Sequence, residues 1–220
     1  MTSSVLRRPA TIPLMRGRSH QAAFFVSVPA ATWLFVAAPT QTARFAALVY
    51  GIALCGMFLA SATYHLHNYA GLSRKILRRI DHSGIAVLIA ATYTVFALMA
   101  LDGVWQVALL TFVWTGAAFG VALNFFPMDR VEMLRGIVYI TLGWSALLIL
   151  PVVVMHLSTV EILFMFLGGL TFTSGAVVLK TQRPDPLPHV FGYHEVWHLF
   201  VIAGEAFHFV FVALLVLSAT

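Results

Sequence analysis

The sequence predicts an all-α polytopic membrane protein, a bundle of seven transmembrane helices, and two observations support this prediction. Hydrophobic residues make up 60% of the 220 residues and charged residues only 10%, which is far from the composition of a soluble domain. The apolar residues are also gathered into long runs of about 20 residues, the length that a helix needs to cross the hydrocarbon core of a bilayer. No linker interrupts these runs, so we expect one domain over residues 1–220 with a short basic tail over residues 1–20.

Seven runs are long and apolar enough to be membrane spans. They cover residues 22–38, 44–66, 82–101, 104–127, 134–155, 157–179 and 194–218. The Pro-rich segment 181–193 ends the sixth span, because its prolines prevent a continuous helix. Gly116 and Gly120 form a small-residue face on the fourth span, which favours close packing against another helix of the bundle, with contact between two copies of the chain as the second interpretation. The first run ends in small residues, Ala37 and Ala38, and so also resembles a signal peptide.

The basic residues are distributed very unequally between the two ends of these spans. Twelve of the 13 Lys and Arg residues fall in the N-terminal tail and in alternate loops, and Arg44 is the exception. Because cytoplasmic loops are enriched in Lys and Arg, we expect the N-terminus in the cytoplasm and, after seven spans, the C-terminus outside. The expected location is a cell membrane, which the chain crosses several times. Basic residues beside a membrane meet anionic lipid headgroups, so the net charge of +5 does not suggest a nucleic-acid partner.

Ionisable residues are costly inside a bilayer, yet several lie at the ends of the predicted spans. His65 ends the second span, Asp81 precedes the third, and His194 and His198 begin the seventh. In the predicted topology all of these ends lie at the cytoplasmic side. Residues four apart on a helix share a face, so His194 and His198 can bind one ion together, with His65 as a third ligand.

Three histidine ligands and an open fourth position are typical of a catalytic zinc site. In this interpretation Asp81 is the general base, which takes a proton from an attacking water and returns it to the leaving group. Ser61 lies one turn from His65, within reach of the water or of a substrate carbonyl. The alternatives are ordinary structural roles: the histidines hydrogen-bond neighbouring helices, and Asp81 is a helix N-cap or pairs with Arg78 or Arg79.

The remaining polar residues are less informative. Glu205 and His208 continue the polar stripe of the seventh span, so this face should point into the bundle. The sequence assigns no definite role to His67, His82, Glu205 or His208. The lone Cys55 excludes an internal disulfide. We expect the histidines of tails and loops to be solvated or interfacial: His20, His156 and His189.

Taken together, these residues resemble the haemolysin III family. The pattern consists of Ser61-x3-His65, Asp81-His82-Ser83-Gly84-Ile85 followed by Ala90-Ala91-Thr92-Tyr93-Thr94, His194-Glu195-x-Trp197-His198, and Gly204-x3-His208-Phe209. This family is a bacterial branch of the progestin and adipoQ receptors, which include the adiponectin receptors, and the wider superfamily includes alkaline ceramidases. The resemblance covers nearly the whole chain and implies a seven-helix protein with its N-terminus inside.

The resemblance also implies a zinc site. In structurally understood relatives, zinc is held by the His of the S-x3-H motif and by both His of the H-x3-H motif, and the Asp at the third helix contacts the zinc-bound water. By these motifs, His65, His194 and His198 are the expected metal ligands. Asp81 and Ser61 are the expected catalytic residues.

Three hypotheses for function follow. The first is a zinc-dependent intramembrane hydrolase acting on an amide or ester bond of a membrane lipid, because receptor-type and ceramidase-type relatives hydrolyse the amide of ceramide. The second is a non-enzymatic membrane sensor or regulator with a structural zinc, for which His82 or His208 would be a fourth protein ligand. The third is a haemolysin-like pore. The acyl substrate and the oligomeric state are not defined by the sequence.

Overall fold

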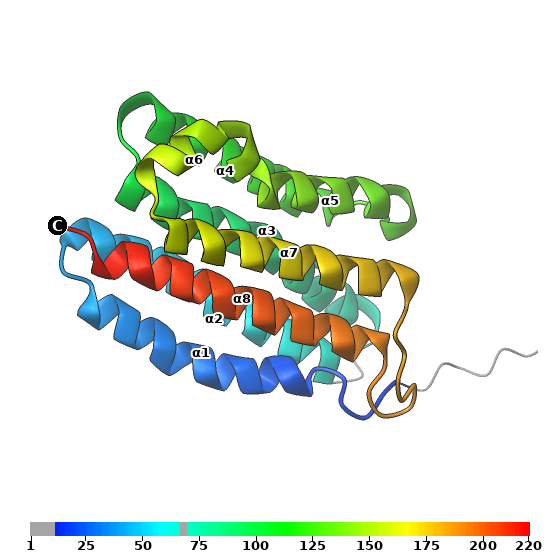
Figure 1. Ribbon diagram of the computed structural model, residues 1–220. Helices are drawn as coiled ribbons and strands as arrows, with labels where there is room; N and C mark the ends of the chain where they lie inside the picture. Colours follow the sequence, from blue (N-terminus) through cyan, green and yellow to red (C-terminus); the bar gives the residue numbers. More distant parts are fainter. Residues whose placement is uncertain (1–11, 67–69) are drawn as a thin grey trace, which may run out of the picture.

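The computed structural model describes residues 12–66 and 70–220, and these residues form helices and no β-strand. The helices are α1 Arg18–Ala37, α2 Gln41–Leu66, α3 Gly71–Ala100, α4 Gly103–Leu123, α5 Met128–Gly143, the 3-10 helix η1 Ser145–Ile149, α6 Leu150–His156, α7 Thr159–Thr181 and α8 Tyr193–Leu217. The long helices run up and down one bundle (Figure 1). In the described part of the chain, six helices are long and apolar enough to cross a membrane alone, and the bent pair of Arg130–Gly143 and Ser145–His156 makes a seventh if it is one span. The prediction of an all-helical, multi-pass membrane protein is therefore confirmed.

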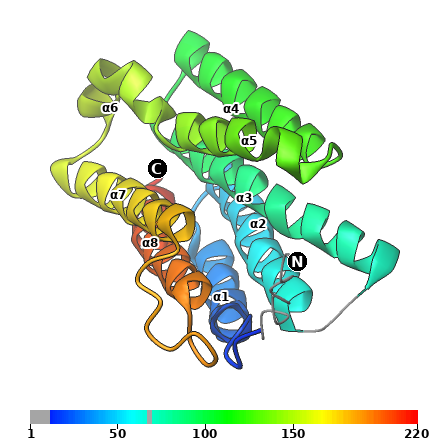
Figure 2. The ribbon, with the colours of Figure 1, turned by 90° about the vertical axis from the view of Figure 1, so that its right-hand side faces the viewer.

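The helices pack around α3 and α8. α8 packs most extensively against α7 and also contacts α1, α2 and α3, while α2 lies between α1 and α3 (Figure 2). The largest side chains in the interior are Tyr50, Phe96 and Phe211, all fully buried. Outward-facing side chains are apolar as well; Phe25 and Val26 on α1, for example, are 66% and 68% exposed. A helix that is apolar all round is typical of a membrane span, whose outer face contacts lipid.

The small-residue face of α4 packs inside the chain. A Cβ atom added to Gly116 would lie 2.5 Å from Leu142 Cδ2 on α5, and one added to Gly120 would lie 3.2 Å from Tyr139 Cε1. The two glycines therefore allow α5 to approach α4 closely. This confirms the interpretation of the face as a helix-packing surface of the bundle.

α3 is longer than the sequence predicts. The predicted third span starts at residue 82, whereas α3 begins at Gly71. Four basic residues between 74 and 79 keep this segment out of the apolar run, but they do not prevent it from being helical. Asp81 therefore lies ten residues inside the helix, and its interpretation as an N-cap is wrong.

The fifth predicted span, residues 134–155, is not one straight helix. The segments Arg130–Gly143 and Ser145–His156 meet at an angle of 41°. Pro151 lies beyond the break, in the first turn of α6, where its missing N–H group is tolerated.

Tyr93 of α3 supports this break. Its hydroxyl donates a hydrogen bond to the carbonyl of Gly143 at 2.9 Å and accepts one from the amide of Ala146 at 3.0 Å. Backbone groups released by a helix break within a membrane need partners from the protein, because no water is available there. Tyr93 supplies a partner to each side of the break.

Candidate metal centre

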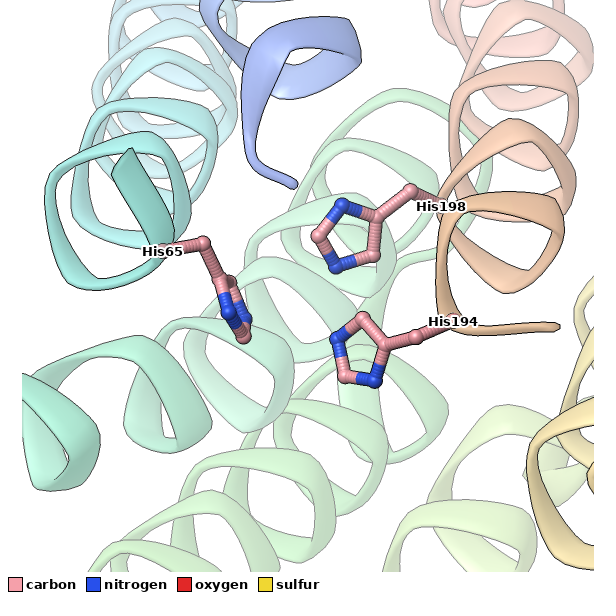
Figure 3. A group of neighbouring side chains, drawn as sticks. All are labelled: His65, His194 and His198. Carbon is pink, nitrogen blue, oxygen red and sulfur yellow. The ribbon is translucent and has the colours of Figure 1, made fainter. Parts of the chain in front are cut away.

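Three imidazoles meet at one end of the bundle. His65 comes from the last turn of α2, and His194 and His198 come from the first turns of α8 (Figure 3). One ring nitrogen of each residue lies within 4.8 Å of the other two. The ring centroid of His65 is 4.8 Å from that of His194 and 5.0 Å from that of His198. The antiparallel arrangement of α2 and α8 thus brings together residues separated by more than a hundred positions.

Two features of this cluster suit a metal ion. His194 Nε2 and His198 Nδ1 are buried and have no hydrogen-bond partner. Buried polar atoms without a partner are costly, and coordination would remove that cost. Imidazole nitrogens are also ordinary zinc ligands. At Zn–N distances of about 2.1 Å a tetrahedral ion separates its ligand atoms by roughly 3.4 Å, so the rings would have to draw together from their present spread.

Asp81 and Ser61 lie beside the cluster. Asp81 Oδ2 is 3.7 Å from His65 Nε2, which is beyond hydrogen-bond distance, and the two side chains are 13% and 11% exposed. Ser61 lies one turn deeper on α2 than His65, is 3% exposed, and neighbours the Asp81 carboxyl. The structure therefore places all five residues selected from the sequence in one region, with the carboxylate and the hydroxyl on the α2–α3 side of the three rings.

A fourth histidine, His20, joins this region, and the sequence does not predict it. His20 is 3% exposed, its Nδ1 lies 2.7 Å from Ser61 Oγ, and its ring stacks on that of His198. The expectation of a solvated or interfacial His20 is wrong because α1 begins at Arg18 and not at residue 22. A signal was present: the buried residues of α1 are His20, Ser27 and Leu34, spaced by seven, which is two helical turns.

The N-terminal segment (residues 12–17) covers the cluster at the end of the bundle. The backbone amides of Leu14 and Met15 donate hydrogen bonds to the carbonyls of His189 and Val190 at 3.1 and 3.0 Å. These bonds join the segment to the loop that leads into α8, so both approach the histidines together.

Arg16 and Gly17 fix this segment. Arg16 forms an ion pair with Glu195, whose carboxylate also accepts a hydrogen bond from the amide of Gly192 at 2.8 Å. Glu195 is 1% exposed and is held by these two contacts, so it anchors the start of α8. Gly17 has a φ of +79°, and a Cβ atom there would lie 2.9 Å from His65 Cβ. Only glycine allows the chain to turn so close to His65.

The histidines to which the sequence assigns no definite role either lie outside the three-histidine cluster or are not among the described residues. His208 Nε2 is 3.3 Å from the carbonyl of Met165, and its ring occupies the space over Gly168, so it holds α8 to α7. Neither His208 nor His82 belongs to the group of close metal-type donors found among the described residues. His67 lies outside the described residues.

Glu205 lies deeper along the same helix. It is seven residues after His198, or roughly 10 Å at 1.5 Å per residue. Its side chain is 5% exposed and accepts a hydrogen bond from the hydroxyl of Tyr50 at 3.3 Å. The prediction that this stripe of α8 faces the bundle interior is confirmed.

Known proteins are similar to most of the length of this chain. A family model described as "Haemolysin-III related" matches residues 10–209. The "Hemolysin-3 homolog" of Bacillus subtilis is 29% identical over 191 residues, which is 86% of each chain. "Hemolysin-3" of Bacillus cereus is 30% identical over 194 residues, 87% of this chain and 85% of the relative. The human "Monocyte to macrophage differentiation factor" is 27% identical over 173 residues, 76% of this chain and 68% of the relative.

Proposed function

The chain belongs to the haemolysin-III-related family, and from that premise we propose that it is a zinc-dependent hydrolase that cleaves an amide or ester bond of a membrane lipid. The observation that carries this proposal is the cluster of His65, His194 and His198 with a carboxylate, Asp81, 3.7 Å from one of its rings. Three protein donors leave one coordination position open, which is the arrangement of catalytic zinc sites and not of structural ones.

The residues have distinct roles in this proposal. His65, His194 and His198 hold the ion. When bound, zinc polarises a carbonyl group and activates a water molecule as a nucleophile at neutral pH. Asp81 accepts the proton that the attacking water loses, and transfers it to the amine or alkoxide that leaves as the acyl bond breaks. Ser61 donates a hydrogen bond to the carbonyl oxygen, where negative charge develops. The products are a fatty acid and the deacylated lipid.

The lipid reaches the site from the cytoplasmic leaflet in this proposal. The metal cluster lies at the end of the bundle that carries the start of α3, with its four basic residues between 74 and 79. Such residues favour the cytoplasmic side and bind anionic headgroups. The scissile bond of an acyl lipid lies just below its headgroup, at the depth of the first turns of α8.

Metal content and lipid hydrolysis test the proposal together. Protein purified without a metal-affinity tag should contain about one zinc per chain. Alanine at His65, His194 or His198 should remove most of it, whereas alanine at the exposed His156, at the other end of the bundle, should not. Asp81→Asn should keep the metal but slow fatty-acid release from a panel of N-acyl and ester lipids by about 10²–10⁴-fold.

Other results of these experiments would contradict the hydrolase proposal. If no acyl lipid releases fatty acid in a metal-dependent way, the hydrolase proposal fails. If His65→Ala then lowers thermal stability while Asp81→Asn leaves stability and cellular phenotype unchanged, a structural zinc in a sensor or regulator is the better interpretation.

A further inference from the structure

His20 is held on three sides. Its Nδ1 lies 2.7 Å from Ser61 Oγ on α2, its ring stacks on that of His198 on α8 with centroids 3.8 Å apart, and the edge of Phe58 contacts it at 5.2 Å. These contacts link α1, α2 and α8 at the depth of the metal cluster. They also place a fourth imidazole next to both a proposed ligand and a proposed catalytic hydroxyl.

The stacked geometry argues against His20 as a fourth ligand. An ion bound to imidazole lies about 2.1 Å from the nitrogen, along a lone pair in the plane of the ring. The planes of His20 and His198 are within 7° of parallel and their centroids are stacked at 3.8 Å. One ion cannot lie in both planes, so an ion held by His198 is not held by His20 as well.

The direction of the hydrogen bond between His20 and Ser61 decides whether the Ser61 proton can reach a substrate. A hydroxyl has one proton to donate, and Ser61 can donate it to a substrate carbonyl only if it is not used on His20. His20 Nε2 is buried without a hydrogen-bond partner. Leaving a buried N–H without a partner costs free energy, which favours the tautomer with the proton on Nδ1, beside Ser61 Oγ. His20 then donates to Ser61 Oγ, and the Ser61 proton is left for the neighbouring Asp81 carboxylate or, when a substrate is bound, for its carbonyl.

We propose that His20 is a positioning residue: it donates its Nδ1–H to Ser61 so that the Ser61 hydroxyl points at the acyl carbonyl, and its ring supports the ring of His198. The inference rests on the proposed function for the identity of the ligand, an acyl group whose carbonyl oxygen binds between Ser61 and the metal. The position and contacts of His20 do not depend on it.

Two variants separate the hydrogen bond from the stacking. His20→Phe keeps a flat ring against His198 but has no donor. His20→Asn loses the ring but places an amide N–H near the position of Nδ1. Each is made in the wild-type chain and in Ser61→Ala. The probe is a long-chain acyl hydroxamate, whose carbonyl mimics that of an acyl lipid, and its binding to cobalt-loaded protein is followed in the visible spectrum.

We expect His20→Phe to keep about one metal per chain and to bind the hydroxamate about tenfold more weakly, the loss of one hydrogen bond at a polarised carbonyl. His20→Asn should bind it more tightly than His20→Phe does. In the Ser61→Ala chain, His20→Phe should cause no further loss of binding.

Other results would overturn the inference. Loss of metal from both His20 variants would identify a ligand. Equal binding losses in His20→Asn and His20→Phe, or an additive loss in the Ser61→Ala chain, would show that His20 does not act through Ser61. Failure of the wild-type cobalt protein to bind the hydroxamate would contradict both proposals. Hydroxamate binding that depends on His20, without fatty-acid release from any lipid, would reject the hydrolase alone.

Discussion

Arg16 connects the N-terminal segment to the start of α8 through one buried carboxylate. Glu195 is 1% exposed on its side chain and Arg16 is 21% exposed, so the pair is shielded mainly on the Glu195 side. Removing one partner of a buried pair leaves the other charge desolvated and uncompensated. The ion pair therefore stabilises the packing of the N-terminal segment over the metal cluster.

Replacement of Arg16 by Met should lower the free energy of unfolding by roughly 3 kcal/mol, the lower end for a broken buried pair because Arg16 is partly exposed. Arg18→Met is the matched control, since Arg18 is exposed and the hydrogen bond described for its side chain goes to Gln21, a neighbour on the same helix. Thermal unfolding in detergent measures both. Equal midpoints for the two variants would show that the pair contributes nothing.

Among single residues, the sequence was sufficient to predict those that stand out by their spacing on one helix or by their polarity within an apolar run. It was not sufficient to predict a residue whose burial depends on contacts between helices. His194 and His198 share a helix face by spacing alone, and His65 is an ionisable residue in an apolar run. His20 lies before the predicted start of the first span, so hydropathy gives it no reason to be buried. Its position depends on Ser61 and His198, which only the packing of three helices brings close.

Among the elements, the broken span of α5 to α6 depends on α3. Tyr93→Phe would remove the hydroxyl that serves both the Gly143 carbonyl and the Ala146 amide. We expect a loss of roughly 1–3 kcal/mol of stability, the cost of unsatisfied backbone groups. Tyr64→Phe is the control, because Tyr64 lies at the end of α2, away from the break. A Tyr93→Phe protein as stable as this control would contradict the role given to the hydroxyl.

Close contact between α7 and α8 depends on a glycine. A Cβ atom at Gly175 would lie 2.5 Å from Phe200 Cβ, which cannot move without its helix. Gly175→Ala should therefore destabilise the bundle by about 1–3 kcal/mol through overpacking.

Gly56 provides the opposite case on α2. A Cβ atom there meets nothing within 4 Å, so Gly56→Ala should stabilise the protein by about 0.5–1 kcal/mol through helix propensity. Thermal midpoints of the two alanine variants should thus shift in opposite directions. A shift of the same sign in both would show that helix propensity, and not contact between α7 and α8, decides the effect at Gly175.

Hydropathy predicted the spans to within a few residues except where charge or backbone geometry intervenes. It does not report that α3 begins well before the apolar run of the third span, because the first turns of α3 are basic. It did not predict the bend in the fifth span, since the backbone groups at the bend find their partner in a hydroxyl from another helix. These are properties of backbone hydrogen bonding, which the polarity of side chains does not report.

For the whole molecule, the charge bias and the helix count support one topology. The helix ends and loops at the metal-cluster end carry the described Lys and Arg residues of the predicted cytoplasmic set, and Arg44 lies in the first turn of α2 at the opposite end. Hydropathy and charge were sufficient to predict a multi-pass bundle, because both reflect the free energy of transferring side chains from water into the membrane. The side on which each terminus lies remains a prediction.

Cysteine labelling tests that orientation. In a Cys55→Ala chain, Lys75→Cys and Arg183→Cys should react in intact cells only with a thiol reagent that crosses the inner membrane. Asp102→Cys, in the loop before α4 at the other end, should react with an impermeant reagent. The reverse pattern would place the metal cluster on the outer side of the membrane.

The proposed metal ligands are far apart in the order of synthesis. A ribosome completes His65 in α2, but His194 and His198 lie in α8, more than a hundred residues later. A nascent chain that ends before residue 193 carries His20, Ser61, His65 and Asp81 without the pair that would complete the cluster. An ion held by all three histidines can therefore be captured only after α8 has been synthesised, so a chain that stops before α8 would not retain it.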